Sequence, residues 1–129
     1  MADNFLYSEL TSVIIKSFFK VYNHLGFGFL EKVYQNALVI ELKKCGISCV
    51  KNHPIDVYYE GQHVGSYYTD ILVNDCIIIE NKSAECLCEE HEAQLVNYLK
   101  ATNIEVGMLL NFGKKAQFKR KVFSAEFKS

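Results

Sequence analysis

Residues 69–83 carry the sequence TDILVNDCIIIENKS, which predicts the centre of a β-sheet. A polar pair at positions 74–75 separates two apolar runs, which is typical of a turn between two β-strands. Asp70 begins the first run, while Glu80 and Lys82 end the second. An ionised side chain costs several kcal/mol to bury unless it is paired or binds a metal ion. These three charges therefore require a structural or functional reason.

The length of the turn decides whether the two acids meet. Opposed residues of an antiparallel pair point to the same face, with Cβ atoms about 4.5 to 5.5 Å apart. A two-residue turn opposes Asp70 to Ile79, whereas a three-residue loop or a bulge opposes Asp70 to Glu80, and we predict the second register. Glu80 and Lys82 share a face in either case. Asn81 points the other way, with its backbone carbonyl near the acids.

Two carboxylates and a carbonyl, with positions left open for water, suit a hard divalent cation such as Mg²⁺ or Mn²⁺. A lysine beside them can orient or deprotonate an attacking water, or neutralise charge that builds up on a phosphate. The pattern predicts metal-assisted hydrolysis of phosphodiester bonds, with Asp70, Glu80 and the Asn81 carbonyl as ligands. The alternative is a buried structural salt bridge between Lys82 and one of the acids.

Helical periodicity marks both the beginning of the chain and a later segment. Apolar residues spaced three and four apart predict helices over residues 8–25, 30–42 and 89–101. Gly46 is expected to stop the second helix. Two helices therefore precede the β-rich part of the chain.

Branched and aromatic residues dominate the segment between the second and third predicted helices. The predicted strands cover residues 55–59, 64–68, 70–73, 77–82 and 104–112, with the first four forming two separate hairpins. Pro54, the only proline, is expected at a strand entry. The last element, around Phe118 to Phe123, is ambiguous. The order of elements predicts an α/β or α+β fold, with a sheet flanked by helices.

Composition limits the class of protein. A chain of 129 residues, of which 50% are hydrophobic, is expected to form a single domain over residues 1–129. No apolar run is long enough to span a bilayer, and the first residues do not resemble a signal peptide, so we expect a cytoplasmic protein without a membrane partner. Five cysteines favour free thiols in a reducing compartment.

Charge is balanced overall and uneven locally. The formal net charge of −1 gives no global attraction to nucleic acid. Basic residues nevertheless gather near the C-terminus: Lys114, Lys115, Lys119, Arg120, Lys121 and Lys128. This segment can lie along a phosphate backbone or form an ordinary solvated surface.

Two further groups of residues have spacings that fit one site. Gln94 and Tyr98 lie four apart in the third predicted helix and share a face. Glu31 and Tyr34 belong to a Gly-x-x-Glu-x-x-Tyr pattern that begins at Gly28. Each also has an ordinary explanation, since a first-turn glutamate is favoured by the helix dipole, tyrosines commonly pack half-buried, and a helical glutamine is commonly solvated.

These motifs together resemble the GxxExxY family, a group within the PD-(D/E)XK nuclease superfamily. The similarity extends from HLGFG through the Glu31 helix, Asp70 and the Glu80-Asn81-Lys82 triplet to HEAQLVNYL. It implies a restriction-endonuclease-like core, with a central mixed sheet flanked by helices, and a divalent metal. Asn81 stands where an apolar residue is usual in the triplet, so we expect that side of the strand to be less deeply buried.

The resemblance also implies roles for individual residues. Asp70 and Glu80 match metal ligands, and Lys82 matches the motif lysine. Glu31 matches a helix glutamate that assists the metal or the water. Gln94 and Tyr98 resemble a QxxxY signature that positions the DNA strand and the lysine. We add as expected substrate contacts the tyrosine of the first motif and part of the basic segment: Tyr34, Lys115, Lys119 and Arg120.

The sequence thus predicts a Mg²⁺-dependent nuclease that acts on DNA. The alternative is a non-catalytic module that keeps the nuclease fold and binds nucleic acid or protein. Small size favours a partner, either a second copy of the chain or another protein. A zinc site at Cys86, Cys88 and His91 is disfavoured because this group supplies three ligands, whereas structural zinc sites close with four.

Overall fold

The structure, a computed structural model, describes residues 7–124 and residue 126. In this part of the chain the elements follow one another as α1 (Ser8–Leu25), α2 (Glu31–Lys44), β1 (Cys49–Tyr59), β2 (Gln62–Val73), β3 (Ile77–Lys82), α3 (Glu89–Lys100), β4 (Val106–Phe112) and β5 (Ala116–Val122). The strands form a sheet in the order β1-β2-β3-β4-β5, with β3 and β4 parallel and the other neighbours antiparallel. The predicted fold class, a central mixed sheet flanked by helices with two of them N-terminal, is confirmed.

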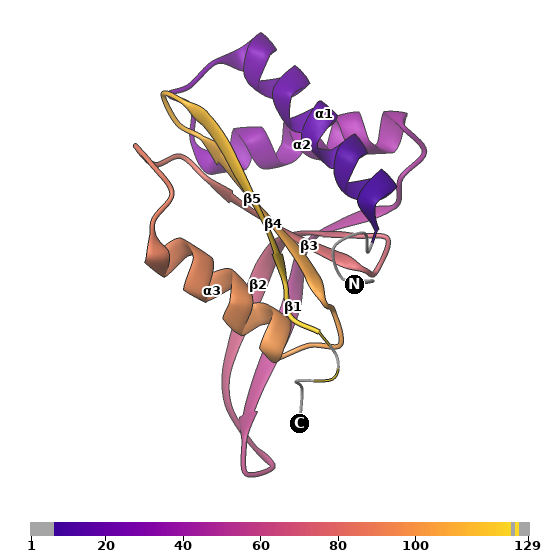
Figure 1. Cartoon of the computed structure of the whole chain (residues 1–129), viewed down its shortest axis with the longest axis vertical. Coiled ribbons are helices and arrows are strands. Elements are labelled where there is room, and N and C mark those ends of the chain that lie inside the picture. The colour runs from indigo at the N-terminus through magenta and orange to yellow at the C-terminus, as the bar shows by residue number, and fades with distance from the viewer. Residues whose placement is uncertain (1–6, 125, 127–129) are drawn as a thin grey trace.

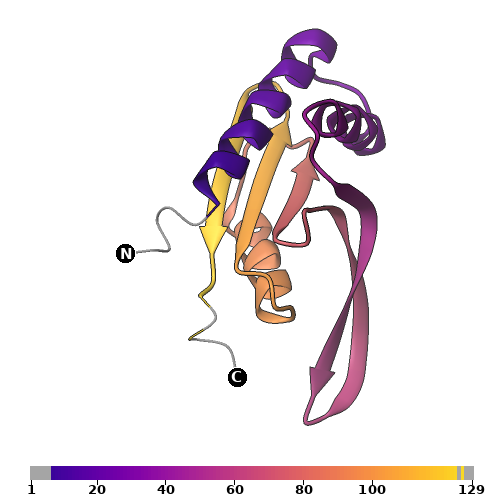
Figure 2. The same ribbon diagram turned by 90° about the vertical axis from the view of Figure 1, so that its right-hand side faces the viewer.

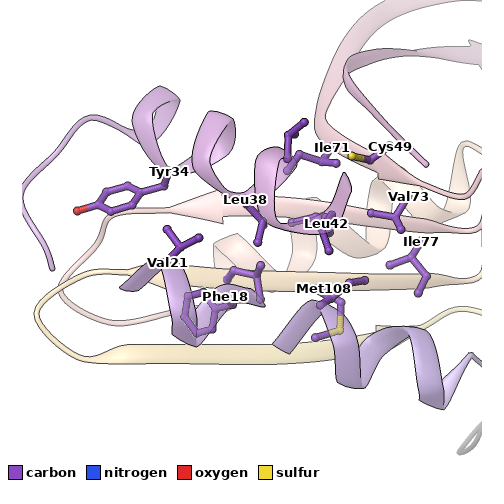
Figure 3. Packing of buried hydrophobic residues seen from close by; sticks show 14 of the residues in the cluster. Phe18, Val21, Tyr34, Leu38, Leu42, Cys49, Ile71, Val73, Ile77 and Met108 are labelled. Atoms are coloured by element: carbon purple, nitrogen blue, oxygen red, sulfur yellow. The ribbon is translucent and has the colours of Figure 1, made fainter. Parts of the chain in front are cut away.

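The helices lie on both faces of the sheet. α1 and α2 cover one face and α3 covers the other, as Figures 1 and 2 show. In the middle strand β3, Ile77 and Ile79 belong to the α1–α2 core, whereas Ile78 belongs to the α3 core. A strand covered on both faces is apolar at successive positions, which explains this run of isoleucines. Figure 3 shows the larger core, where Phe18 and Leu38 pack against the sheet.

Both N-terminal helices end at glycines with left-handed backbone. Gly26 follows α1 with a φ of 70°, and its N–H donates to the Tyr22 carbonyl (2.8 Å). Gly46, with a φ of 76°, stops α2 as predicted. None of the helices in the described residues is long and apolar enough to cross a bilayer. The five cysteines are free thiols.

The β-rich segment differs from its prediction in strand count. The predicted runs 64–68 and 70–73 form one continuous strand, β2, so the division into two separate hairpins is wrong. The partner strand β1 is also longer than predicted and contains Pro54 in its interior rather than at its entry. Proline is tolerated there because β1 is an edge strand. The ambiguous last element is the opposite edge strand, β5.

The predicted register of the second turn is confirmed. Ile71 pairs with Ile79 and Val73 pairs with Ile77, so a three-residue loop joins the two strands. Continuing this register by one residue places Asp70 opposite Glu80. The loop turns through left-handed conformations at Asn74 and Asp75, residues whose short polar side chains tolerate positive φ.

Candidate active site

Asp70 and Glu80 face each other just beyond the last paired residues of β2 and β3. The N–H of Asp70 donates to Glu80 Oε2 (2.9 Å), and the N–H of Asn81 donates to Asp70 Oδ2 (2.7 Å). Each carboxylate therefore accepts a hydrogen bond from the backbone of the opposite strand. The two acids are held by the sheet itself, which fixes their separation more firmly than a loop would.

The environment of the two acids disfavours negative charge. Burial, and then the charge of Asp70, raises the pKa of Glu80 to about 8, against the opposing effects of the Asp70 N–H and of Lys82. Burial also raises the pKa of Asp70, while the Asn81 N–H and Lys82 lower it. Glu80 is only 5% exposed. A cation placed between the carboxylates would offset both the burial and the mutual repulsion.

Lys82 reaches toward α3 rather than onto an acid. Its Nζ donates to Gln94 Oε1 (2.9 Å), which connects the end of β3 to the first half of α3. Within residues 7–124 and 126, no ion pair joins Lys82 to Asp70 or Glu80. The alternative, a structural salt bridge between Lys82 and one of these acids, is therefore not observed in the described part of the chain. Gln94 stands next to Lys82, where the resemblance implied it.

Glu31, at the first position of α2, approaches the site from the opposite layer. Its Oε2 accepts a hydrogen bond from the N–H of Ser83 (3.2 Å), the residue after Lys82. Its charge contributes to the raised pKa of Glu80. In the described residues, no three side chains of His, Cys, Asp or Glu are grouped closely enough to hold one metal ion, so Glu31 does not complete a three-acid cluster in this arrangement.

Tyr98 lies on the same side of the sheet as the acids. Burial, followed by the charges of Glu80 and Asp70, raises the pKa of its hydroxyl to about 12. Its ring contacts that of Tyr67 on β2, with centroids 5.7 Å apart. His91 is occupied elsewhere, since its Nδ1 accepts from the N–H of Cys88 at the start of α3 (3.3 Å).

Tyr34 does not fit the predicted substrate contact because it is completely buried. Its ring stacks on Phe112 with centroids 4.4 Å apart. Its hydroxyl donates to the Gly26 carbonyl (2.6 Å) and accepts from the N–H of Phe29 (3.2 Å). Tyr34 therefore holds the glycine-containing loop before α2, and its effect on Glu31 is indirect.

The basic residues near the C-terminus do not all lie on one face of the edge strand β5. Lys119 and Lys121 both form ion pairs with Glu92 of α3, the former at 3.5 Å. Arg120 pairs in register with Met108, a residue of the core beneath α1 and α2. Adjacent strand residues point to opposite faces, so Lys119 and Arg120 do not form one surface. Lys115 lies in the turn between β4 and β5. Lys128 lies outside the described residues.

The expectation that Asn81 lies on a less buried side of β3 is wrong. Asn81 is 1% exposed, because α1 and α2 cover that face of the sheet. Neither atom of its side-chain amide has a hydrogen-bond partner among the described residues.

Gln35 supports the site, a role that its sequence motif does not predict. Its Nε2 donates to the carbonyl of Asp70 (2.7 Å) and to Asn52 Oδ1 (3.1 Å). Asn52 has a φ of 56°, so Gln35 fixes an irregular point of β1 directly beside Asp70. The available signal was a glutamine on the buried face of a helix, one residue after Tyr34.

Asn111 supports the other end of the site. Its Oδ1 accepts from the N–H of Ala84 and its Nδ2 donates to the carbonyl of Ala84, each at 2.9 Å. The segment that follows Lys82 is thus tied to the parallel neighbour β4 by two hydrogen bonds. The signal here was one asparagine within an otherwise apolar strand.

The donor set at Asp70 and Glu80 fits a divalent cation. One oxygen of each carboxylate is used by a backbone N–H, and the other oxygen has no hydrogen bond within the described part of the chain. Two free carboxylate oxygens in a poorly solvated position are the ligands that Mg²⁺ and Mn²⁺ prefer. The Asn81 carbonyl and Glu31 are the nearby groups from which further ligands would come.

Comparison with known proteins identifies the family and supports the fold. No curated protein matches the chain. The crystal structure of SSO0001 resembles it with a TM-score of 0.58 at 18% identity, over 90% of this chain and 59% of that one. Such a likeness shows the fold alone, and the chain spans less than two thirds of the length of SSO0001. The model of the PD-(D/E)XK nuclease superfamily matches residues 8–121. The chain therefore belongs to the PD-(D/E)XK nuclease superfamily.

Proposed function

We propose that the chain is a metal-dependent nuclease that hydrolyses DNA phosphodiester bonds at the site formed by Asp70, Glu80 and Lys82. The observation that supports this most strongly is a pair of opposed carboxylates, of which Glu80 is buried, beside a lysine that is hydrogen-bonded to neither of them. A purely structural network would be expected to pair the lysine with an acid.

Asp70, Glu80 and the Asn81 carbonyl are the residues that would hold Mg²⁺ or Mn²⁺, with Glu31 contributing directly or through a water. A bound divalent ion lowers the pKa of a coordinated water and neutralises charge on the phosphate. The raised pKa of Glu80 supports this role, because a metal ion replaces the proton that the apo site retains.

Lys82 would act on the phosphate or on the attacking water. An ammonium group has three donors, and Gln94 accepts one of them in the structure. The remaining donors are available for a phosphate oxygen, where developing charge is stabilised, or for the water that attacks. Gln94 is thus a positioning residue in this proposal, since it acts through Lys82.

Cleavage of labelled DNA tests the proposal directly. Wild type with Mn²⁺ is expected to cut, and Asp70→Asn is expected to be inactive because one ligand is weakened. Asp75→Asn is the matched control, an exposed acid in the adjacent turn at a φ that asparagine tolerates. Lys82→Ala is expected to bind Mn²⁺ normally and to cut about 100-fold more slowly. Cleavage by Asp70→Asn at the wild-type rate would refute the proposal.

A further inference from the structure

A groove lies between α3 and the β1–β2 hairpin. Its volume is about 770 Å³, within the range of pockets that bind small molecules. Tyr58, Tyr67 and Tyr98 contribute aromatic rings to its wall, and Gln94 and Asn97 contribute side-chain amides. The closed end of the hairpin projects beyond the rest of the molecule, as Figure 1 shows.

The groove is continuous with the candidate active site through α3. Gln94 lines the groove and also accepts the hydrogen bond from Lys82. Tyr98, four residues later in the helix, lines it too and contacts the ring of Tyr67. A molecule whose phosphate reaches Lys82 would therefore have its neighbouring groups beside these rings.

The two hairpin tyrosines that line the groove are exposed to solvent. Tyr58 is 62% exposed and Tyr67 is 50% exposed. Exposed aromatic surface at a groove commonly marks a binding site. The groove-lining residues that carry a charge at neutral pH are Asp56, Glu90 and Lys100, which gives two acids against one base. This balance disfavours a phosphate and is compatible with a neutral aromatic ligand.

We propose that this groove binds an unpaired nucleobase of the substrate strand, stacked on Tyr67 and Tyr58, while the adjacent phosphate occupies the Asp70–Glu80–Lys82 site. The proposal rests on the proposed nuclease function and adds its substrate class, DNA with unpaired bases next to the cleaved bond. A base inside a duplex has both faces covered by its neighbours, so it would have to leave the stack before it could enter the groove. Aromatic stacking accepts every base, which predicts little sequence preference.

The test measures binding in EDTA, where no cleavage occurs, by fluorescence anisotropy. The probes are a fluorescein-labelled oligothymidine, the same strand with abasic residues in place of thymidines, and a blunt duplex of equal length. Wild type is expected to bind oligothymidine about tenfold more tightly than either of the other probes, since stacking is worth roughly 5- to 150-fold per base.

Variants of the hairpin separate stacking from other effects. Tyr67→Ala is expected to weaken oligothymidine binding about tenfold and to leave the abasic strand unaffected. Tyr67→Phe keeps the ring and is expected to bind within about twofold of wild type. Tyr59→Ala is the matched control, because Tyr59 is 67% exposed on the same hairpin and does not line the groove.

Two results would overturn the inference: equal binding of oligothymidine and the abasic strand by wild type, or an equal loss for both strands in Tyr67→Ala. The first comparison needs no variant, so it holds even if a substitution disturbs folding. Failure of the nuclease function is distinguishable. In that case Mn²⁺ produces no cutting, whereas the dependence of oligothymidine binding on Tyr67 persists.

Discussion

Replacement of Glu80 by glutamine is expected to stabilise the metal-free protein at neutral pH. The unfolded chain ionises this carboxyl near the ordinary value of 4.5, whereas the folded protein raises its pKa to about 8. The folded state therefore binds the proton more tightly, and stability falls as pH rises from 4.5 toward 8. Glutamine has nearly the same shape and can still accept the hydrogen bond from the Asp70 N–H.

The size of the effect follows from the two pKa values. Each pH unit between the two pKa values lowers the free energy of unfolding by about 1.4 kcal/mol. At pH 7 the wild type is therefore about 3 kcal/mol less stable than a protein with a side chain that does not ionise at this position. At pH 5 the same comparison gives less than about 1 kcal/mol. For a domain of this length, 3 kcal/mol corresponds to roughly 10 °C in Tm.

Differential scanning calorimetry in EDTA at pH 5 and pH 7 measures this difference. Glu80→Gln should melt at roughly 10 °C above wild type at pH 7 and close to wild type at pH 5. Glu92→Gln is the control for removal of a charge, since Glu92 forms surface ion pairs instead. If Glu80→Gln did not raise the Tm at pH 7, or raised it equally at pH 5, burial of an ionised Glu80 would not be what destabilises the wild type. Added Mn²⁺ should raise the Tm of wild type far more than that of Glu80→Gln.

Three further substitutions test the supporting contacts. Gln94→Ala should lower kcat about tenfold with Mn²⁺ affinity unchanged, because it frees Lys82 without touching the acids; a change confined to metal affinity would contradict this role. Asn111→Ala should lower the free energy of unfolding in urea by about 1 to 3 kcal/mol, since both polar groups of Ala84 lose their partner. Tyr34→Phe should lower the free energy of unfolding by about 1 kcal/mol in the same assay and keep the fold. A loss of DNA-binding free energy larger than this loss of stability would indicate instead that Tyr34 contacts the substrate.

Local patterns were sufficient for the helices and for the central hairpin. The spacing of apolar residues identifies α1, α2 and α3, and the three-residue loop predicted between the two apolar runs gives the observed register of β2 and β3. The positions of Asp70 and Glu80 depend only on this short segment, which explains why their proximity was predictable from the sequence.

Elements whose state depends on distant neighbours were less predictable. β5 carries three consecutive basic residues, Lys119, Arg120 and Lys121, and is an edge strand, so its apolar signal is weak until β4 is placed beside it. Pro54 is acceptable within β1 only because that strand has one neighbour. Lys119 and Arg120 likewise point to opposite faces because they are adjacent in a strand, and a count of charges along the sequence does not show this.

The sequence marks the supporting residues of the site as unusual for their segments, but it does not show which groups they contact. Gln35 is a polar residue on a buried helix face, and Asn111 is polar within an apolar strand. Their partners are 35 and 27 residues away in the chain, so only the folded arrangement identifies them. Tyr34 shows the reverse case, because its motif position suggested substrate contact and its burial assigns it to the core.

Calorimetric titration of Mn²⁺ into wild type, Asp70→Asn and Asp75→Asn measures whether Asp70 and Glu80 bind a metal ion. We expect saturable binding to wild type and to Asp75→Asn, with binding weakened at least tenfold in Asp70→Asn. Binding of equal strength in all three proteins, or no binding to wild type at pH 8, would contradict the assignment of Asp70 and Glu80 as a metal site.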